Sequence, residues 1–546
     1  MKDVLGLLCL TAGLAAHAAP LSGVPAANMK ADGYAPASQL TREWRQEPVA
    51  VGAMPLENPE GIVGWYGYQN DTPSPANAAV PQMLPLPVIA PAKPTEAQKT
   101  EPDKNTYLVL WGQKGGDRHY NYGTHFLFQG HEAGVGGASY ITRINLDADT
   151  AHRVTLLATH DVDGNPIANI DGSTWDPFAR RLLFTTENAS APTYSATLDV
   201  PSKVEDVSGA LGRGGYEGIQ NDNYGNIWIV EDIGGSNKRT DPNDPATATT
   251  ARRPNSFVFR YVPRRPGDLH HGKLQVLQVI VGDHPATFES QAALFAPDQV
   301  AIRTFHTSYR TRWITIHDTH VDGNAPFNAN DKAKAAGGTP FKRPENGVFR
   351  PGSNFREFFF VETGDTNATS PENDVGGWCS IFRLVQRSAD DDEGYISVFF
   401  KGTQSVAGLD NVTFLSRDKL LAVEDAGDGL HGQRNALDSG FVFDTDADYS
   451  RPHNRPVRFL AEGRDASATI DSANGGFGKN DGDNEITGIH VSDGDPGENG
   501  ILGAKVPRFG HDGWRMFWTQ QHGDNVTWEV TPAKHADNCD DDHDDW

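Results

Sequence analysis

Acidic residues recur at two fixed places in a repeated unit of this chain. Each unit has an acid, a short turn, and then an apolar strand that ends in a second acid, as in the stretch from Glu217 to NIWIVE at Glu231. Carboxylates at equivalent points of repeated units can surround one axis, and carboxylate oxygens are the ligands that hard cations prefer. The paired acids lie 14–17 residues apart, and they are Asp171 and Glu187, Glu217 and Glu231, Glu345 and Glu362, and Asp410 and Glu424.

Three further segments repeat the pattern less closely. Asp298 precedes WITIHD, and Glu485 begins EITGIHV, which is followed by RMFWTQ after an insertion rich in Gly, Asp and Pro. HFLFQGHE ends at Glu132 but has no acid at the expected earlier position. So many like charges around one cavity could not all stay ionised, and bound cations would remove the repulsion. The alternative is that these acids simply favour turns and point into solvent.

We expect the segments that carry these acids to form short strands. Between residues 105 and 530 the apolar runs are β-branched or aromatic and are bounded by Gly, Asp, Asn and Pro, which is typical of an all-β protein. Spacings of 46 and 47 residues between successive first acids match one four-stranded propeller blade, and longer spacings imply insertions. We therefore predict an all-β fold, a β-propeller with about six blades and loop insertions, over residues 105–530.

The two ends of the chain differ from this domain. Residues 1–18 have the pattern of a secretory signal peptide, with Ala18 at the end of a small-residue cleavage site. Residues 19–104 are rich in Pro and Ala and predict an extended N-terminal arm or linker. Residues 531–546 form an acidic tail. The sequence thus predicts an exported protein, periplasmic or secreted, with no transmembrane segment.

Net charge limits the kinds of molecule this protein can bind, and its few cysteines limit the possible disulfides. Acids outnumber bases by 72 to 47, giving a net charge of −25, which argues against nucleic acid and anionic membranes as partners. After signal removal two cysteines remain, Cys379 and Cys539, and in an exported protein they could pair or stay free. Arginines near the repeats suit phosphate oxygens and equally suit ordinary surface pairing with the excess of acids; they are Arg303, Arg310, Arg312, Arg343 and Arg350.

Six of these motifs, in order, resemble those of the PhoX-type alkaline phosphatases, which are exported bacterial β-propellers that use calcium and iron. The resemblance covers residues 105–525 and is patchy. It rests on GHE (130–132), TTEN (185–188), GYEGIQNDNYGNIWIVED (215–232), RPENG (343–347), LDNVTFLSRDKLLAVED (409–425) and NEITGIHVSDGD (484–495).

The resemblance implies a set of metal ligands but no general base. In the family an iron-bridging cysteine falls at the position of Thr186, and a hydroxyl is a poor substitute for a thiolate at ferric iron. Calcium is therefore the expected cofactor, and iron is disfavoured. The implied ligands are Glu132, Glu187, Glu217, Glu345, Glu424 and Glu485, together with one or both of Glu231 and Asp232.

These expectations favour an exported, metal-dependent phosphoester hydrolase that acts on a small phosphoester. Clustered cations would polarise a phosphoryl oxygen and activate a water molecule, and an arginine would stabilise the developing charge. Two other functions stay open. A non-catalytic, calcium-stabilised binding or scaffold propeller is favoured by Thr186, and a lactonase- or esterase-type propeller would hold one central calcium.

Overall fold

The structure is a computed structural model, and several parts of the chain lie outside the residues it describes. The described residues are 21–25, 38–52, 54–61, 63–67, 100–132, 139–239, 250–288, 296–365, 376–434, 436–462, 485–521 and 525–533. The predicted signal peptide and most of the predicted acidic tail lie outside them. No helix among the described residues is both long enough and apolar enough to cross a membrane.

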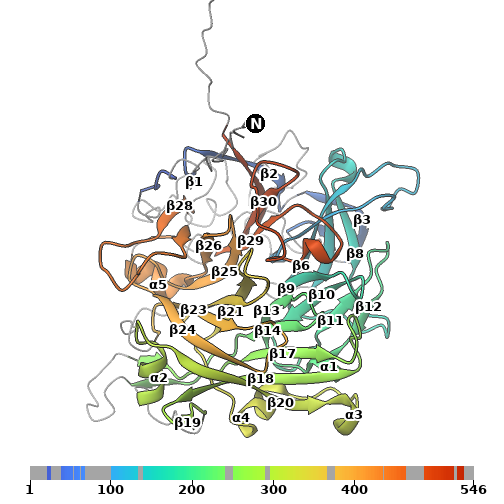
Figure 1. The fold of residues 1–546 in the computed structure, drawn as a ribbon. Helices are drawn as coiled ribbons and strands as arrows, with labels where there is room; N and C mark the ends of the chain where they lie inside the picture. The colour runs from blue at the N-terminus through green and yellow to red at the C-terminus, as the bar shows by residue number, and fades with distance from the viewer. Residues whose placement is uncertain are drawn as a thin grey trace, which may run out of the picture.

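Antiparallel four-stranded sheets make up most of the fold (Figure 1). The first two units are β5 (Thr106–Val109), β6 (His125–His131), β7 (Tyr140–Asn145) and β8 (Val154–Ala158), then β9 (Ile170–Asp176), β10 (Arg181–Thr186), β11 (Tyr194–Ala196) and β12 (Val204–Asp206). The third and fourth are β13 (Tyr216–Asn221), β14 (Ile227–Glu231), β17 (Val258–Pro263) and β18 (Gly272–Val281), then β21 (Pro344–Phe349), β22 (Glu357–Glu362), β23 (Ser380–Gln386) and β24 (Glu393–Lys401).

The last two units each take up a strand from the N-terminal part of the chain. They are β25 (Leu409–Phe414), β26 (Lys419–Glu424), β27 (Ser439–Asp444) and β28 (Val457–Ala461) with β1 (Gln39–Leu40), then β29 (Glu485–Ser492), β30 (Arg515–Gln521) and β31 (Val526–Pro532) with β2 (Trp44–Ala50). Because β2 pairs with β31, the N-terminal region completes the last sheet of the propeller.

A long strand complicates the count of blades. β20 (Tyr309–Asp318) pairs with both β18 and β24, so the third and fourth units form one ten-stranded sheet. Apart from two sheets of only two strands each, the described strands form six units if the third and fourth are counted separately, and five sheets if β20 joins those two into one. The predicted all-β propeller is confirmed, and the number of blades depends on how β20 is counted.

The remaining elements are short. The strands are β3 (Pro55–Glu60), β4 (Val63–Trp65), β15 (Asn237–Arg239), β16 (Thr250–Arg252) and β19 (His284–Pro285), and the helices are α1 (Ser208–Leu211), α2 (Pro297–Ile302), α3 (Thr319–Asp322), α4 (Ala329–Ala335) and α5 (Gly427–Arg434).

Successive apolar side chains of the second strands point to opposite faces of their sheets, which explains why the sheets stack. In β10, Leu182 and Phe184 pack towards the first unit, whereas Leu183 between them packs towards the third. In β22, Phe360 packs towards the third unit and Phe359 packs towards the fifth. Successive side chains of a strand point to opposite faces, so each sheet is buried on both faces and the core lies between adjacent sheets.

Residues 39–65 lie within the region for which the sequence predicts an arm, yet they form strands β1–β4. Trp44, Ala50, Leu56 and Tyr66 are buried in the core cluster that also holds residues of β30 and β31. The short strands are hidden in the sequence by the Pro- and Ala-rich stretch that follows them. Their apolar side chains cover the last unit of the propeller.

The first strands of the units contact one another in a closed order, β5, β9, β13, β21, β25, β29 and back to β5. In Figure 1, β13, β21 and β25 lie near the middle of the molecule, and β18 and β20 lie at its lower edge. The first strands therefore surround the axis of the propeller. Side chains at the beginning of these strands are brought to one end of that axis.

Candidate metal centre

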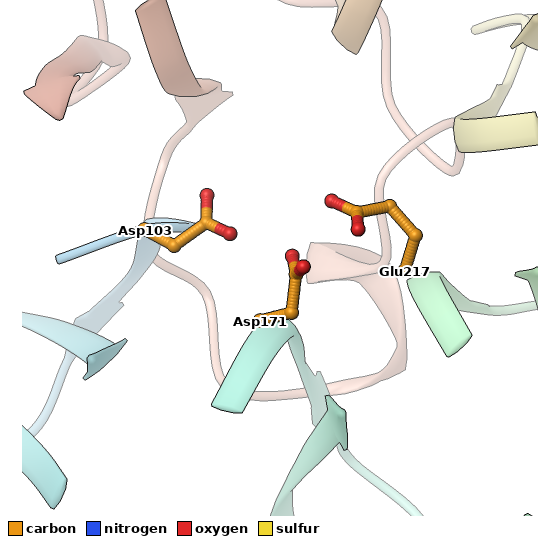
Figure 2. Close-up of side chains that lie close together, drawn as sticks. All are labelled: Asp103, Asp171 and Glu217. Carbon is orange, nitrogen blue, oxygen red and sulfur yellow. The ribbon is translucent and has the colours of Figure 1, made fainter. Parts of the chain in front are cut away.

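Each of the six first strands brings one acidic residue to the axis. The acid lies at the start of the strand or, in the first unit, shortly before it. We call this set the inner ring, and its members are Asp103 before β5, Asp171 in β9, Glu217 in β13, Glu345 in β21, Asp410 in β25 and Glu485 in β29. Figure 2 shows three of them, Asp103, Asp171 and Glu217, with their carboxyl groups directed towards one another.

The backbone is irregular where the inner ring is formed. The pairing of β13 with β14 shifts between Tyr216 and Ile219, on either side of Glu217, and that of β25 with β26 shifts between Leu409 and Val412. Similar shifts occur at the acids of β9 and β21, whereas in β29 the shift comes after Glu485, between Thr487 and His490. A β-bulge turns a side chain away from the regular alternation, which allows the acid to face the axis.

Glycines next to two of these acids allow the units to approach closely. A Cβ atom on Gly172 would lie 2.0 Å from the carbonyl oxygen of Glu217, and one on Gly218 would lie 2.7 Å from that of Glu345. No residue other than glycine fits against a neighbouring backbone at such a distance. The Asp-Gly and Glu-Gly pairs of the sequence thus belong to the geometry that holds the carboxylates together.

The carboxylates form three overlapping groups. In each group, one ligand oxygen per residue lies within 4.8 Å of the others. Two oxygens that bind one calcium ion at 2.3–2.6 Å are at most about 5 Å apart, so each group fits a single cation. The groups are Asp103, Asp171 and Glu217; Glu217, Glu345 and Asp410; and Glu132, Asp171 and Glu187. Because Glu217 and Asp171 each belong to two groups, the three sites adjoin.

Burial makes these carboxylates difficult to ionise without a counter-ion. Burial, together with the charges of Glu217 and Asp103, raises the pKa of Asp171 well above its usual range. Burial likewise raises the pKa of Glu217 well above its usual range, and the charges of Glu345 and Asp410 add to it. A bound cation would stabilise the ionised form of each group.

Lys104 places one amino group within the inner ring. Its Nζ donates hydrogen bonds to the side-chain oxygens of Asn346, at 2.8 Å, and Asn411, at 2.9 Å. Burial lowers the pKa of Lys104, whereas the charges of Asp410 and Asp103 oppose that effect. Four of the ring acids make no ion pair with any described residue: Asp103, Asp171, Glu217 and Asp410. One ammonium group is thus shared among several carboxylates.

A small cavity adjoins Lys104 along the first strands. It has a volume of about 30 Å³, and Tyr107 and His490 line it together with Lys104. The segment after β29 lies across it, because Trp175 donates a hydrogen bond from Nε1 to the Pro496 carbonyl at 2.7 Å. A cavity of this size holds little more than one water molecule. At the opposite end Glu187 is exposed, so the carboxylate groups reach solvent there.

Four of the acids at the ends of the second strands form a second level, which we call the outer tier: Glu231, Asp232, Glu362 and Glu424. Glu132 and Glu187, which follow β6 and β10, belong to the carboxylate groups instead. Arg343 donates to Asp232 from Nε at 2.9 Å and from Nη2 at 2.7 Å. Arg303 binds Glu362 with both side chains fully buried. Both acids therefore have a guanidinium partner.

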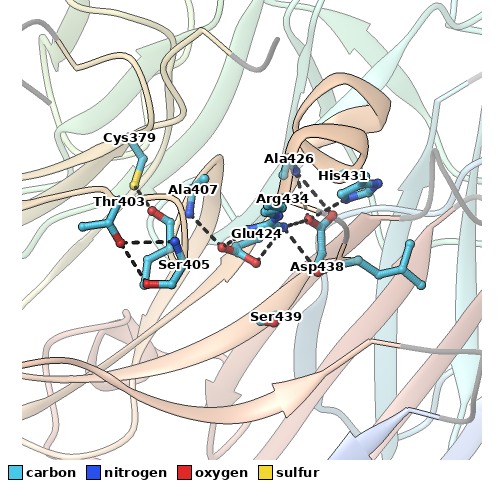
Figure 3. A network of polar contacts seen from close by, with 12 residues as sticks. Cys379, Thr403, Ser405, Ala407, Glu424, Ala426, His431, Arg434, Asp438 and Ser439 are labelled. Carbon is cyan, nitrogen blue, oxygen red and sulfur yellow. Dashed lines mark hydrogen bonds and ion pairs between the residues drawn. The ribbon is translucent and has the colours of Figure 1, made fainter. Parts of the chain in front are cut away.

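The other two acids of the outer tier are also held by protein donors. Arg434 donates to Glu424 from Nη1 at 2.8 Å and from Nη2 at 3.0 Å, and the backbone N–H of Ala407 donates as well (Figure 3). Glu231 accepts from the backbone N–H of Phe257 and from Asn330. The outer tier thus has its donors within the protein.

The predicted ligands divide between these environments. Glu132, Glu187, Glu217 and Glu345 lie in the three carboxylate groups. Glu485 is at the start of β29, where its pKa is raised well above its usual range by burial and by the charges of Asp425 and Asp410. The predicted ligands Glu231, Asp232 and Glu424 lie in the outer tier, and their role as ligands stays a prediction.

Three residues of the carboxylate groups were absent from the predicted ligand set. Asp171 and Asp410 already stood out as the first acids of their repeats, so the pattern itself contained the signal. Asp103 is the acid that the Glu132 unit seemed to lack. The turn between β5 and β6 is long, which places Asp103 too far from Glu132 for the usual spacing.

The Asp298 segment does not belong to the inner ring. Asp298 lies in α2, where both of its carboxylate oxygens are close to His284 Nε2, at 3.2 and 3.1 Å. WITIHD is part of β20, the strand that joins the third and fourth units. The similarity to the repeat was therefore local, and this segment connects units instead of forming one.

No thiolate is available at the carboxylate groups within the described residues. Thr186 is buried and its hydroxyl donates to the carbonyl oxygen of Pro192 at 3.0 Å. Cys379 is a free, buried cysteine in the core between the fourth and fifth units, and burial raises the pKa of its thiol. Cys539 lies outside the described residues. The donor set of the centre consists of carboxylate oxygens, which suits calcium better than iron.

Comparison with known proteins shows the fold. The sequence matches no protein-family model and no curated protein. Pseudomonas fluorescens PhoX, solved in complex with vanadate, a transition state analogue, is similar with a TM-score of 0.53 and 11% identity, over 94% of this chain and 98% of that chain. An identity this low indicates a shared β-propeller fold and not a shared activity.

Two lactonases are more distant. The periplasmic gluconolactonase PpgL of Pseudomonas aeruginosa has a TM-score of 0.28 and 13% identity over 77% of this chain and 98% of that chain. The gluconolactonase XC5397 of Xanthomonas campestris has a TM-score of 0.25 and 12% identity over 70% of this chain and 90% of that chain. Similarity at this level supports no conclusion about the site.

Proposed function

We propose that this protein is an exported, metal-dependent phosphoester hydrolase whose metal centre is the inner ring. The observation that carries the proposal is the sharing of Asp171 and Glu217 among three carboxylate groups. A shared carboxylate can bridge two cations, and adjacent cations suit the transfer of a phosphoryl group between two oxygens. The solved PhoX complex with vanadate is the structural neighbour that supports a phosphoester as the substrate class.

The residues of the chain have separate roles in this proposal. Asp103, Asp171, Glu217, Glu345 and Asp410 would hold the cations, with Glu132 and Glu187 at the side that reaches solvent. Bound cations would polarise a phosphoryl oxygen and lower the pKa of a water molecule. Lys104 closes the inner end of the centre and leaves the side of Glu187 for the substrate.

Arg343 is the arginine best placed to bind a phosphoryl group. Its Nη2 lies 3.4 Å from Glu345 Oε1, and Asp232 fixes its orientation through two hydrogen bonds. Its backbone has a φ of 57°, in the left-handed region that a bulky residue adopts only when the surrounding structure holds it there. A guanidinium fixed at the edge of the ring can orient a phosphate without being displaced from the protein.

Thr186 favours a second candidate function, a calcium-stabilised binding or scaffold propeller. Its hydroxyl is bonded to Pro192 and Cys379 lies in a separate core cluster, so the described residues provide no thiolate for a bridged iron pair. If catalysis requires such a pair, this chain would bind calcium and hydrolyse nothing.

The deciding experiment measures metal content and hydrolysis on the same preparation of the full chain. Elemental analysis gives calcium and iron per protein, and initial rates are measured with p-nitrophenyl phosphate and with gluconolactone, before and after EDTA. We expect hydrolysis of the phosphoester that requires calcium, that vanadate inhibits, and that falls at least about 100-fold in Glu217→Gln.

The alternatives give different results in the same experiment. Hydrolysis of the lactone alone, with one calcium per chain, would indicate a lactonase-type propeller. Full calcium occupancy without hydrolysis of either substrate would indicate the scaffold. Arg265→Gln is the matched control, because Arg265 is exposed and its nearest carboxylate oxygen, on Asp268, is 3.7 Å away.

A further inference from the structure

A large cavity lies far from the inner ring, at the other end of β21. Glu345 is near the start of β21 and Arg350 follows its end, so the strand separates the two places. The cavity has a volume of about 700 Å³ and is formed by residues 350–357, the hairpin between β23 and β24, β20, and the turn between β25 and β26. A second cavity of about 630 Å³ adjoins it, since Arg310 and Tyr395 line both. Each has the size of a small-molecule site.

Six arginines line the two cavities, against three acids, Asp283, Glu357 and Glu393, in a chain with a net charge of −25. We call the two cavities together the arginine groove. Its arginines are Arg310, Arg312, Arg350, Arg356, Arg387 and Arg417.

One arginine of the groove is structural. Arg350 is mostly buried, and it donates to the carbonyl oxygen of Arg417 at 3.1 Å and to Glu357 at 3.3 Å, with a further bond to Asp418. These contacts use all of its nitrogens. Arg350 therefore positions the turn that carries Arg417 and does not itself provide binding capacity.

Two other arginines keep their guanidinium groups available. Arg356 is exposed and donates from Nε to the carbonyl oxygen of Ser353 at 3.0 Å, and it makes no ion pair with any described residue. The side chain of Arg417 is exposed and likewise has no acidic partner within the described chain. Arg310 is only loosely paired, 4.0 Å from Glu393. The larger cavity is therefore lined by two guanidinium groups without an acidic partner among the described residues and by a third that is only loosely paired.

The loop that presents Arg356 has an unusual backbone. Gly352, Asn354 and Phe355 all have positive φ angles, 75°, 56° and 56°. A left-handed conformation is strained for phenylalanine, and strained loops of this kind are concentrated at functional sites. Phe355 is buried against Phe349, which holds the loop in place. The direction of Arg356 is therefore determined by a fixed loop and not by a flexible one.

The groove also has an apolar surface. Tyr395 is 55% exposed and Val385 is 36% exposed, and both line the larger cavity. Tyr395 is at the junction of the two cavities, where its ring is open to a ligand. An exposed aromatic ring next to charged groups suits a ligand that has a flat carbon face as well as negative charge.

We propose that the arginine groove binds a short acidic oligosaccharide, with its carboxylate or sulfate groups on Arg356, Arg417 and Arg310 and one sugar ring on Tyr395. Guanidinium groups bind such oxyanions through paired N–H groups. A short chain fits better than a long polyanion, because the protein's net charge of −25 would repel the part that extends beyond the arginines. The site is separate from the inner ring and does not depend on the proposed hydrolase activity.

The test is calorimetric titration of the calcium-loaded full chain with a uronic acid tetrasaccharide. A neutral glucose tetrasaccharide and inorganic tripolyphosphate are titrated in parallel. We expect the uronate to bind, the neutral sugar not to bind, and Arg356→Gln and Arg417→Gln each to weaken uronate binding by about tenfold. Tyr395→Ala should weaken the uronate but leave any binding of tripolyphosphate unchanged. Arg265→Gln should leave all three titrations unchanged.

Four results would overturn the proposal. Absence of uronate binding excludes the site, and equal binding of the neutral sugar excludes recognition of charge. If tripolyphosphate binds more tightly than the uronate and Tyr395→Ala has no effect, the groove binds phosphate and not sugar. Uronate binding that EDTA abolishes and both arginine variants preserve would place the ligand on the metal centre.

Discussion

Acidic residues are buried at two levels of this propeller, and the two levels differ in their partners. In the outer tier, Glu362 lies against Arg303 and Glu424 lies against Arg434. In the inner ring, Asp171 and Glu217 have carboxylate neighbours on both sides, and the ammonium group of Lys104 is held by asparagine oxygens. Three of the four outer-tier acids thus have an arginine partner, whereas the six acids of the inner ring share Lys104 and, at Glu345, a longer contact of 3.4 Å with Arg343.

This difference shows what each level requires. A buried carboxylate is costly unless a partner compensates its charge, and a guanidinium group does so permanently. Several carboxylates around one axis cannot each have a guanidinium group, because the side chains would not fit in the same channel. Small divalent cations can satisfy them. Stability of the outer tier should therefore be independent of metal, and stability of the inner ring should depend on it.

The largest effect is expected from breaking a pair in the outer tier. Arg303→Gln leaves Glu362 fully buried without its guanidinium partner, and it should lower the free energy of unfolding by about 3–5 kcal/mol. Urea denaturation measures the change. The loss should be the same in calcium and in EDTA, and Arg265→Gln should show none. A loss that appears only in EDTA would mean that the two levels are not independent.

Removal of metal tests the inner ring directly. Cations present at 100 to 1,000 times their dissociation constant stabilise the folded chain by about 2.7–4.1 kcal/mol, so EDTA should lower the thermal midpoint of the unmodified protein. Scanning calorimetry with and without EDTA, followed by addition of calcium, measures this. An identical curve in all three conditions, for a preparation that initially contained metal, would refute the metal centre.

A matched pair of substitutions separates the levels. Glu217→Gln removes a carboxylate that two groups share, and it should weaken calcium binding by about tenfold or more. Glu424→Gln should leave calcium binding unchanged and reduce stability, because Arg434 loses its charged partner. Calcium titration of both variants provides the measurement. Equal loss of calcium in the two variants would show that Glu424 is a ligand, as the sequence predicts.

The smallest effect concerns pH. Burial and neighbouring charges raise the pKa values of Asp171 and Asp410 in the folded chain, so the metal-free protein retains protons that the unfolded chain has already released. Unfolding then releases protons, so stability falls as pH rises above about pH 4, the usual pKa of an aspartate in an unfolded chain. Calcium should flatten this slope, because it takes the place of the protons. Thermal midpoints of the EDTA-treated protein that rise with pH would contradict the assignment.

Much of the inner ring could be predicted from the repeat, because the repeat is a local feature. Four acids of the ring begin a repeat in the sequence, and in the structure each lies on the first strand of its unit. They are Asp171, Glu217, Glu345 and Asp410. Asp103 was missed because the long turn between β5 and β6 hides its spacing. Asp298 was included because a helix before a connecting strand imitated the same pattern over a short distance.

The chain alone determined the all-β fold, the periodic acids and the absence of a cysteine at position 186, since all three depend on residue type and spacing along the chain. Only the tertiary structure decided which acids have partners. Arg343 and Asp232 are 111 residues apart, and Lys104 and Asn411 are 307 residues apart. Such pairs form only when the propeller closes, and burial, which makes an unpaired carboxylate costly, does not exist before closure. The repeat therefore predicts where acids gather, and the closed ring determines which of them require a metal.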